Sequence, residues 1–380
     1  MALGMKSLKQ PVSRESIASI PWMSAKSLSH VIRDVSIRGP QLKEVWDQIQ
    51  SRADVIAHSF NAKQSALVVV GLGKIVSEHP EFVNKLFVDR FVSKFLHQIF
   101  SSCNSLDIAQ ILYGLSRLGK CVDFGNVIET NVPLMDVNSL SMTSLALSSP
   151  IFQSQLSRDL LLVILQRAVA LENVNDQCIG QVLHLSTPFG ADPLCNPLIL
   201  ILHAKLVDGL DQISFKSLAL VLSSMCSSEC PISPDFLSML HCALLAKEYS
   251  GATLTSLGVI LRSIQKIYTH EHVIDFTPVS SLLIEEIGKR NLLNQGTRTL
   301  GLLLSAISRQ ASTCNTTSSV VTASILNALN ERPVAEFSEF ISILSSMGRL
   351  GQTHPFLLRW AQVHQTAMTS KQLDLLASLV

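Results

Sequence analysis

Residues 106–119 read LDIAQILYGLSRLG, and this stretch shows most clearly how the chain is built. Its apolar side chains recur at the spacing of one helix face, at Ile108, Ile111, Leu112, Leu115 and Leu118. Gly119 follows, and glycine readily takes the left-handed conformation that ends many helices. The stretch therefore predicts an amphipathic helix that ends at Gly119.

Segments with the same apolar pattern recur along the chain and begin near Ser65, Thr143, Gln177, Lys216, Thr255, Arg298 and Phe337. When the segments are aligned, one position is small in all copies but the last, which has Ile341; the small residues are Ala66, Ala109, Ala146, Gly180, Ala219, Gly258 and Gly301. The copies lie 34 to 43 residues apart, about 39 on average, which is enough for two helices and two short turns. Because a small residue lets two helices cross closely, we expect this column at helix–helix contacts.

A second helix is expected in most of the intervals between these segments. The expected ranges are 82–100, 157–171, 192–207, 233–247, 277–289, 318–330 and 355–367, with a weaker signal at 121–135. Residues 373–380 resemble the opening of a ninth first helix. Alternating strand patterns with hairpin turns are absent from the sequence. We therefore predict an all-α fold, an α-solenoid of about eight paired-helix repeats over residues 61–380.

The composition favours a folded protein that is incorporated in a larger assembly. Of the 380 residues, 47% are hydrophobic and 16% are charged, which is too apolar for a disordered chain. The charged fraction is also below the value of about 25% that is typical of soluble domains. No apolar run reaches the roughly 18 residues that a membrane span needs. We therefore expect part of the surface to be covered by partners.

The net charge of +1 conceals a polarised distribution. Residues 1–120 hold 15 Lys and Arg against 9 Asp and Glu, residues 121–250 hold 5 against 12, and residues 251–380 hold 10 against 8. Residues 1–60 form a basic extension whose first 40 residues are also rich in serine. This composition is typical of an organellar transit peptide or a basic arm, and a solvated tail fits it equally well.

The repeats resemble those of organellar RNA-associated proteins, on the evidence of LDIAQILYGLSRLG and of ISILSSMGRLG at residues 341–351. The similar families are the octotricopeptide and heptatricopeptide groups and the repeats that precede RAP domains in FAST-kinase-like proteins. The resemblance covers residues 61–380, and it departs from the RAP proteins in that no charged α/β domain follows the repeats. It implies a mitochondrion or a plastid, RNA as ligand and a place in an organellar ribosome, and it brings no catalytic residue.

The strongest candidate for a binding site is a column eight residues after the small position. Five of its eight members are basic, namely Lys74, Arg117, Lys266, Arg309 and Arg349, and the other three fall in the acidic middle of the chain. Equivalent positions of a solenoid line up along one edge, so these side chains could bind RNA phosphates. Alternatively, they could cap carbonyl groups and offset the helix macrodipole in the last turn of each helix.

Other chemistry receives little support from the sequence. The eight cysteines suggest reduced thiols in an intracellular compartment, and the spacing of Cys226, Cys230, His241 and Cys242 is poor for zinc. The glycines of GLGK at residues 71–74 lie within a helical pattern and do not match a P-loop. His270, Glu271, His272 and Asp275 favour a polar turn. Aromatic residues are scarce, so RNA binding would depend on the phosphate backbone more than on base stacking.

These observations predict a non-catalytic, RNA-associated scaffold without metal or cofactor. The expected setting is the mitochondrion, or alternatively a plastid, and the expected role is a component or assembly factor of the mitochondrial ribosome that contacts rRNA and neighbouring proteins. The alternative is a protein-only adaptor or structural subunit of another organellar complex. An enzyme is not expected, and neither is a small-molecule substrate.

Overall fold

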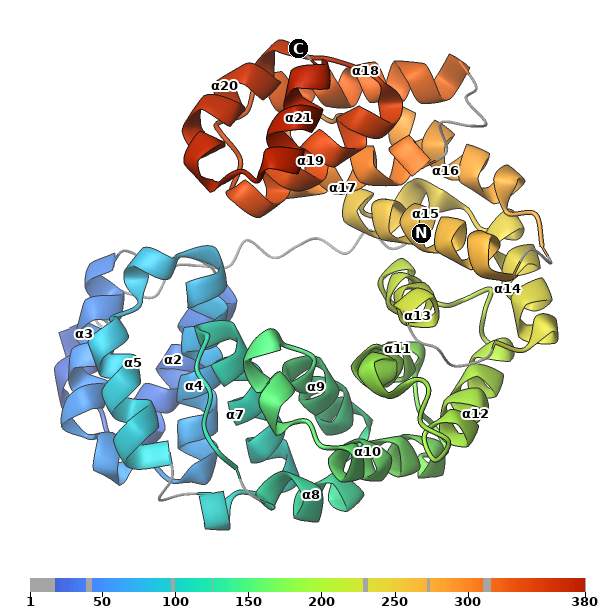
Figure 1. Cartoon of the computed structure of the whole chain (residues 1–380). Coiled ribbons are helices and arrows are strands. Elements are labelled where there is room, and N and C mark those ends of the chain that lie inside the picture. Colours follow the sequence, from blue (N-terminus) through green and yellow to red (C-terminus); the bar gives the residue numbers. More distant parts are fainter. Residues whose placement is uncertain are drawn as a thin grey trace, which may run out of the picture. The chain divides into compact units, whose positions relative to one another are not determined.

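The computed structural model describes residues 18–38, 43–96, 100–124, 126–227, 232–271, 274–309 and 316–379. Over these ranges the chain forms helices that pack in neighbouring pairs and contains no strand, so the all-α prediction is confirmed (Figure 1). The chain divides into two compact units, Met1–Leu185 and Ser186–Val380. No helix within these ranges is long and apolar enough to cross a bilayer.

The amino-terminal unit alternates between two rows of helices. Row A contains α2 (Ala25–Arg38), α4 (Ala62–Glu78), α7 (Ser105–Leu118) and α9 (Val137–Leu147), and each packs against the next. Row B contains α3 (Lys43–Val55), α5 (Lys85–Phe91), α8 (Val127–Asn131) and α10 (Arg158–Ala170). A further helix, α11 (Asp176–Ser186), ends this unit, and Ser141 of α9 hydrogen-bonds Gln181 of α11. The packed helices of this unit thus begin before residue 61.

The carboxyl-terminal unit continues the same alternation. Its row A contains α13 (Phe215–Ser227), α15 (Leu254–Glu271), α17 (Thr297–Ile307), α19 (Phe337–Leu350) and α21 (Ser370–Leu379), packed in this order. Its row B contains α12 (Asn196–Val207), α14 (Pro234–Ala246), α16 (Thr277–Gly288), α18 (Thr316–Asn330) and α20 (Pro355–His364), also packed in order. The last helix, α21, takes the place of the expected ninth first helix, because it packs against α19.

Local sequence signals explain where α7 begins and ends. Asn104 accepts a hydrogen bond from the Asp107 amide, and the Asp107 carboxylate accepts one from the Asn104 amide, which forms a capping box at the start of the helix. Gly119 has a φ of 65° and ends the helix, as predicted, and Gly351 ends α19 with a φ of 59°. A side chain at either position would be strained, because positive φ disfavours residues with a Cβ atom.

The column of small residues is buried, and two of its glycines lie at contacts between row A helices, as predicted. A Cβ atom on Gly258 would lie 3.1 Å from Leu302 of α17. A Cβ atom on Gly301 would lie 3.1 Å from Ile343 of α19. The closest approach to a neighbouring backbone among the described glycines is elsewhere, where α4 meets α7: a Cβ atom on Gly114 would lie 2.6 Å from the backbone of Val69.

Four expected helices differ from those observed. The weakly expected helix 121–135 is only the short α8, Val127–Asn131, followed by a 3₁₀ turn at Val132–Leu134. The segment 82–100 was expected to be one helix, but α5 covers Lys85–Phe91, with Asn84 as its N-cap, and a π-helical turn covers Val92–Leu96. Helix α12 starts at Asn196 instead of residue 192, because the Asp192 carboxylate accepts hydrogen bonds from the amides of Leu194 and Cys195 in a turn. The α20 helix ends at His364 and continues as a short 3₁₀ turn.

A repeated contact joins consecutive helices of row B. A basic residue at or just beyond the end of the helix donates a hydrogen bond to a backbone carbonyl 32 to 41 residues upstream, in the segment that follows the preceding row B helix. The pairs are Arg167 with Met135 (2.8 Å), Lys247 with Asp211 (3.0 Å), Arg290 with Ser250 (2.6 Å), and Arg332 with Leu293. We refer to these contacts as the carbonyl clamps. Each one gives a turn carbonyl a side-chain donor and links one pair of helices to the next.

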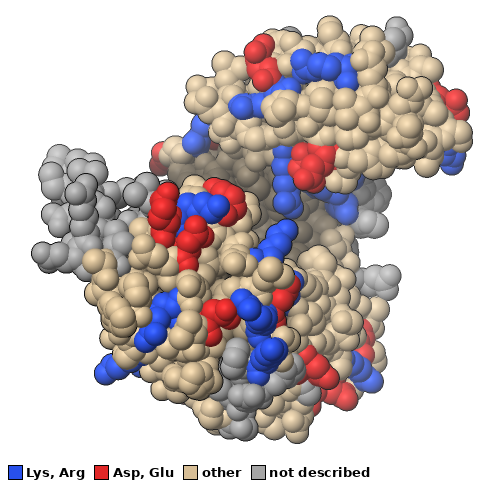
Figure 2. Space-filling model, turned by 90° about the vertical axis from the view of Figure 1, so that its left-hand side faces the viewer, with Lys and Arg blue, Asp and Glu red and all other residues tan. Residues whose placement is uncertain are grey.

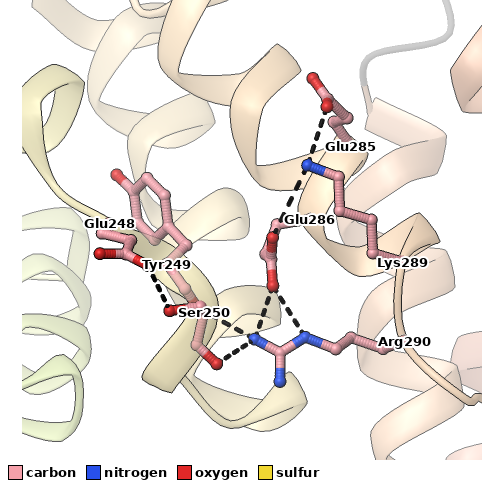
Figure 3. A network of polar contacts seen from close by, with 7 residues as sticks. All are labelled: Glu248, Tyr249, Ser250, Glu285, Glu286, Lys289 and Arg290. Atoms are coloured by element: carbon pink, nitrogen blue, oxygen red, sulfur yellow. Dashed lines mark hydrogen bonds and ion pairs between the residues drawn. The ribbon is translucent and has the colours of Figure 1, made fainter.

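The clamp at Arg290 is the most extensive of these contacts (Figure 3). Its guanidinium group donates to the carbonyl oxygens of Tyr249 and Ser250 and forms an ion pair of 2.6 Å with Glu286. The neighbouring Lys289 forms exposed ion pairs with Glu285 and Glu286. Arg290 is therefore held between the end of α16 and the turn after α14.

Candidate nucleic-acid interface

The predicted basic column divides into two sets, one in each unit. Lys74 lies on α4 and Arg117 on α7, in the amino-terminal unit. Lys266 lies on α15, Arg349 on α19, and Arg309 follows the end of α17, in the carboxyl-terminal unit. All five lie toward the carboxyl end of a row A helix, as the repeat alignment predicts.

Arg117 bridges α7 and α4 without meeting a carboxylate among the described residues. One of its guanidinium nitrogens donates to the Ser77 hydroxyl at 3.5 Å, and another donates to the Tyr113 hydroxyl at 3.2 Å. The group also lies 5.3 Å from the centre of the Tyr113 ring, within range of a cation–π contact. Lys74 is half-buried, one residue beyond Gly73, whose missing side chain leaves room for the Arg117 Cβ atom.

Arg349 gathers with two other arginines. Its guanidinium group donates to the Ser308 hydroxyl at 3.1 Å and to the Ser346 hydroxyl at 2.9 Å. Burial lowers the pKa of Arg349 below its usual value, and the positive charges of Arg309 and Arg262 lower it further. Arg309 and Arg262 therefore both lie close enough to Arg349 to repel its charge, and neither of them forms an ion pair with a carboxylate in the described part of the chain.

Lys266 belongs to the same group through Cys226. Burial raises the pKa of the Cys226 thiol to about 11, while a side-chain hydrogen bond with Ser263 and the positive charges of Lys266 and Arg262 act in the opposite direction. The thiol also donates a hydrogen bond to the Ser263 carbonyl at 2.9 Å. Cys226, Arg262 and Lys266 line a hollow of about 190 Å³ between α13, α15 and α17. We call Arg262, Lys266, Arg309 and Arg349 the cationic cluster.

A groove runs beside the cluster across α15, α17 and α19. It has a volume of about 570 Å³ and shares Val259, Arg262 and Leu302 with the smaller hollow. Six side-chain hydroxyls line it, from Thr255, Thr297, Thr299, Ser305, Ser338 and Ser342. Arg262 and Arg298 supply its positive charge, and Glu339 is its one carboxylate among the residues described. The groove therefore presents many hydrogen-bond donors to a ligand.

The helices add to the positive potential of the groove. Thr255, Arg298 and Ser338 all lie in the first turns of their helices, where the backbone amides are unpaired and the macrodipole is positive. Gly301, a member of the small column, lies in the floor of the groove. The first turns of α15, α17 and α19 therefore all line the same groove.

The sequence pattern did not single out Arg262 and Arg298. Arg262 is four residues after Gly258, and the equivalent positions of the neighbouring repeats hold Ser223, Ser305 and Ser345. Charge does not recur at this position of the repeat, so the pattern of basic residues does not reveal Arg262. A signal was available in the serines themselves, because three small hydroxyl residues and an arginine at one helical position indicate a polar face.

The described residues provide no evident metal centre. No group of three or more His, Cys, Asp and Glu residues that could hold a metal ion occurs within the described ranges. The Cys and His set whose spacing is poor for zinc includes Cys230, and the expected polar turn includes His272, and both residues lie outside those ranges. The GLGK glycines, residues 71 and 73, lie inside α4, as expected.

Comparison with known proteins adds no family assignment, because no protein-family model matches the chain and no curated protein matches its sequence. Figure 2 shows one face of the molecule, where Lys and Arg are interspersed with Asp and Glu and most of the surface carries neither charge.

Proposed function

We propose that this chain is a non-catalytic RNA-associated scaffold whose residues 61–380 form an α-solenoid of about eight paired-helix repeats with a period near 39 residues. The contacts between consecutive row A helices within each unit support this proposal. The carbonyl clamps of Lys247, Arg290 and Arg332, which are 43 and 42 residues apart, support it further.

One observation carries the RNA proposal: four cations gather beside a hydroxyl-lined groove. Burial lowers the pKa of Arg349, and the positive charges of Arg309 and Arg262 lower it further, so a bound anion would offset the repulsion that Arg349 experiences. Phosphates accept charge-assisted hydrogen bonds from arginine and from hydroxyls, so a phosphodiester backbone matches the donors present. Lys74 and Arg117 form a second, smaller contact in the amino-terminal unit.

The organellar setting is proposed from the sequence. Residues 1–60 are basic and rich in serine, and the repeats resemble those of organellar RNA-associated proteins. The low charged fraction favours permanent incorporation in a particle. We therefore place the chain in the mitochondrion, with a plastid as the alternative, as a component or assembly factor of the ribosome that contacts rRNA and neighbouring proteins. It uses no cofactor.

The test is co-sedimentation from organelle extracts of cells that express the tagged full chain. The proposal predicts that the chain migrates with rRNA-containing particles and is released when nuclease degrades the RNA. Migration that does not depend on rRNA would contradict it. A fusion of residues 1–60 to a fluorescent protein should enter mitochondria, and cytosolic retention would refute the targeting role.

A protein-only adaptor is the second candidate, and exposed apolar side chains on row B favour it. The exposed residues are Leu200, Ile201, Met239, Leu282, Val320 and Leu358, from five successive row B helices. Solvent-exposed apolar residues on neighbouring elements suit contact with another protein. This candidate predicts that the chain stays in a large complex after complete nuclease digestion.

A further inference from the structure

We propose that the groove across α15, α17 and α19 binds a short segment of single-stranded RNA, with Arg262 and Arg298 as phosphate ligands and Glu339 as the group that selects ribose over deoxyribose. The inference rests on the proposed function and specifies its site, and it assigns roles to three residues that lie outside the repeated basic column.

The dimensions favour a strand over a single ion. The groove extends over three helices, and packed helices lie about 8 to 10 Å apart, so its length is roughly 16 to 20 Å. Its volume of about 570 Å³ falls within the range of about 300 to 1,000 Å³ that is usual for ligand sites. A free phosphate would occupy a small part of this space.

The two arginines are available for phosphates. Arg298 is exposed at the start of α17, and Arg262 is exposed on α15 at the junction of the groove with the cationic cluster. Neither side chain forms a hydrogen bond or an ion pair with another described residue. A guanidinium group can donate two parallel hydrogen bonds to one phosphate, and the hydroxyls around it can donate to the remaining oxygens.

Glu339 determines which nucleic acid fits. Its carboxylate is half-buried in the groove wall, where it repels phosphates and accepts hydrogen bonds only. A neighbouring strand must therefore offer a donor to Glu339. The 2′-hydroxyl of ribose is such a donor, and deoxyribose lacks it. The same carboxylate disfavours an acidic peptide, which has only acceptors in its side chains.

The experiment measures the affinity of the full chain for a fluorescein-labelled 12-nucleotide poly(U) RNA and for the matching deoxyuridine strand, by fluorescence anisotropy at several salt concentrations. Arg262→Gln and Arg298→Gln should each weaken RNA binding about tenfold and flatten the log–log salt slope by about 0.7. Lys289→Gln is the matched control, because Lys289 is an exposed cation on row B, and it should leave both quantities unchanged.

Glu339→Ala tests the selection step. The substitution removes the carboxylate that repels the phosphates of both strands, so the affinity for DNA should rise. It also removes the acceptor for the 2′-hydroxyl, so the ratio of RNA affinity to DNA affinity should fall toward one. Folding of every variant is checked by far-UV circular dichroism. If an arginine variant has an altered helix content, Arg262→Lys or Arg298→Lys is measured in its place. These lysine variants keep the positive charge and should retain most of the RNA affinity.

The possible failures are distinct. If the chain binds RNA but the two arginine variants behave like Lys289→Gln, the groove is not the site, and the proposed function stands. If the chain binds neither probe, the proposed function and the inference both fail. If a poly-glutamate peptide displaces the RNA at equal charge concentration, or RNA and DNA bind equally to the wild type, the assignment of this groove to RNA is overturned.

Discussion

The contact between α4 and α7 gives the sharpest prediction of stability. A Cβ atom on Gly114 would lie 2.6 Å from the carbonyl carbon and oxygen of Val69, and these atoms belong to the backbone of α4. No rotamer change relieves such a clash, so Gly114→Ala must push the two helices apart by about 1 Å to restore a normal carbon–carbon separation of about 3.5 Å.

The expected loss of stability follows from two opposing effects. Overpacking costs about 3 kcal/mol when the neighbour is rigid, and the higher helix propensity of alanine returns about 1 kcal/mol, which leaves a net loss of about 2 kcal/mol. For a unit of this size, the melting temperature should fall by about 4 to 8 °C. Gly209→Ala is the control, because a Cβ atom there meets nothing within 4 Å. It should be neutral or stabilise the chain by at most about 1 kcal/mol.

The assay is urea unfolding followed by far-UV circular dichroism and by the fluorescence of tryptophan, since Trp46 is fully buried in the same unit as Gly114. The reasoning is wrong if Gly114→Ala unfolds at the same urea concentration as the wild type. It is equally wrong if Gly209→Ala is the more destabilised of the two variants, because the close approach of α4 and α7 would then have no energetic consequence.

Three further predictions follow from the described contacts. Arg290→Gln should destabilise the chain by about 1 to 2 kcal/mol through loss of its clamp, whereas Lys289→Gln should cost less than about 0.5 kcal/mol in the same urea assay. Burial lowers the pKa of His203 from 6.5 to about 4, so only the unfolded chain takes up this proton in that interval. Stability should fall as the pH falls from 6.5 to 4, by up to about 3 kcal/mol, and His203→Leu should flatten this dependence in pH-dependent thermal melts. Because burial raises the pKa of Cys226 to about 11, its alkylation in the folded chain should accelerate about tenfold for each pH unit between 7 and 10, as measured by peptide mass spectrometry; a rate independent of pH would contradict the burial of this thiol.

The sequence predicts the helices and their pairing well, and the reason is local. Residues 106–119 contain their own capping residue, apolar face and glycine stop, so the pattern specifies α7 without tertiary information. The segment 82–100 has the same apolar density, but it divides after Phe91 because a π-helical turn replaces the α-helical hydrogen bonds. Such a change depends on packing and leaves no periodic signal.

The site is less predictable because it depends on contacts between repeats. The basic column predicted the positions of Arg309 and Arg349, but not that Arg262 would join them, since Arg262 has no basic counterpart in neighbouring repeats. The carbonyl clamps did leave a signal in the sequence. Successive clamp residues are separated by 80, 43 and 42 residues, for Arg167, Lys247, Arg290 and Arg332 in this order. Their partners are backbone carbonyls, which have no sequence signature, so the pattern alone could not assign them a structural role.

The central claim is that the basic column binds RNA phosphates, and the salt dependence of RNA affinity tests it most directly. The measurement compares the full chain with a variant in which Lys74, Arg117, Lys266, Arg309 and Arg349 are all replaced by glutamine. At about −0.7 per phosphate contact with a single strand, the wild type should show a log–log slope of about −3.5 or steeper, and the variant should lose about 3.5 from it. An unchanged slope, with a loss of only about 0.3 to 1 kcal/mol in stability for each residue replaced, would show that these side chains cap helices and would contradict the claim.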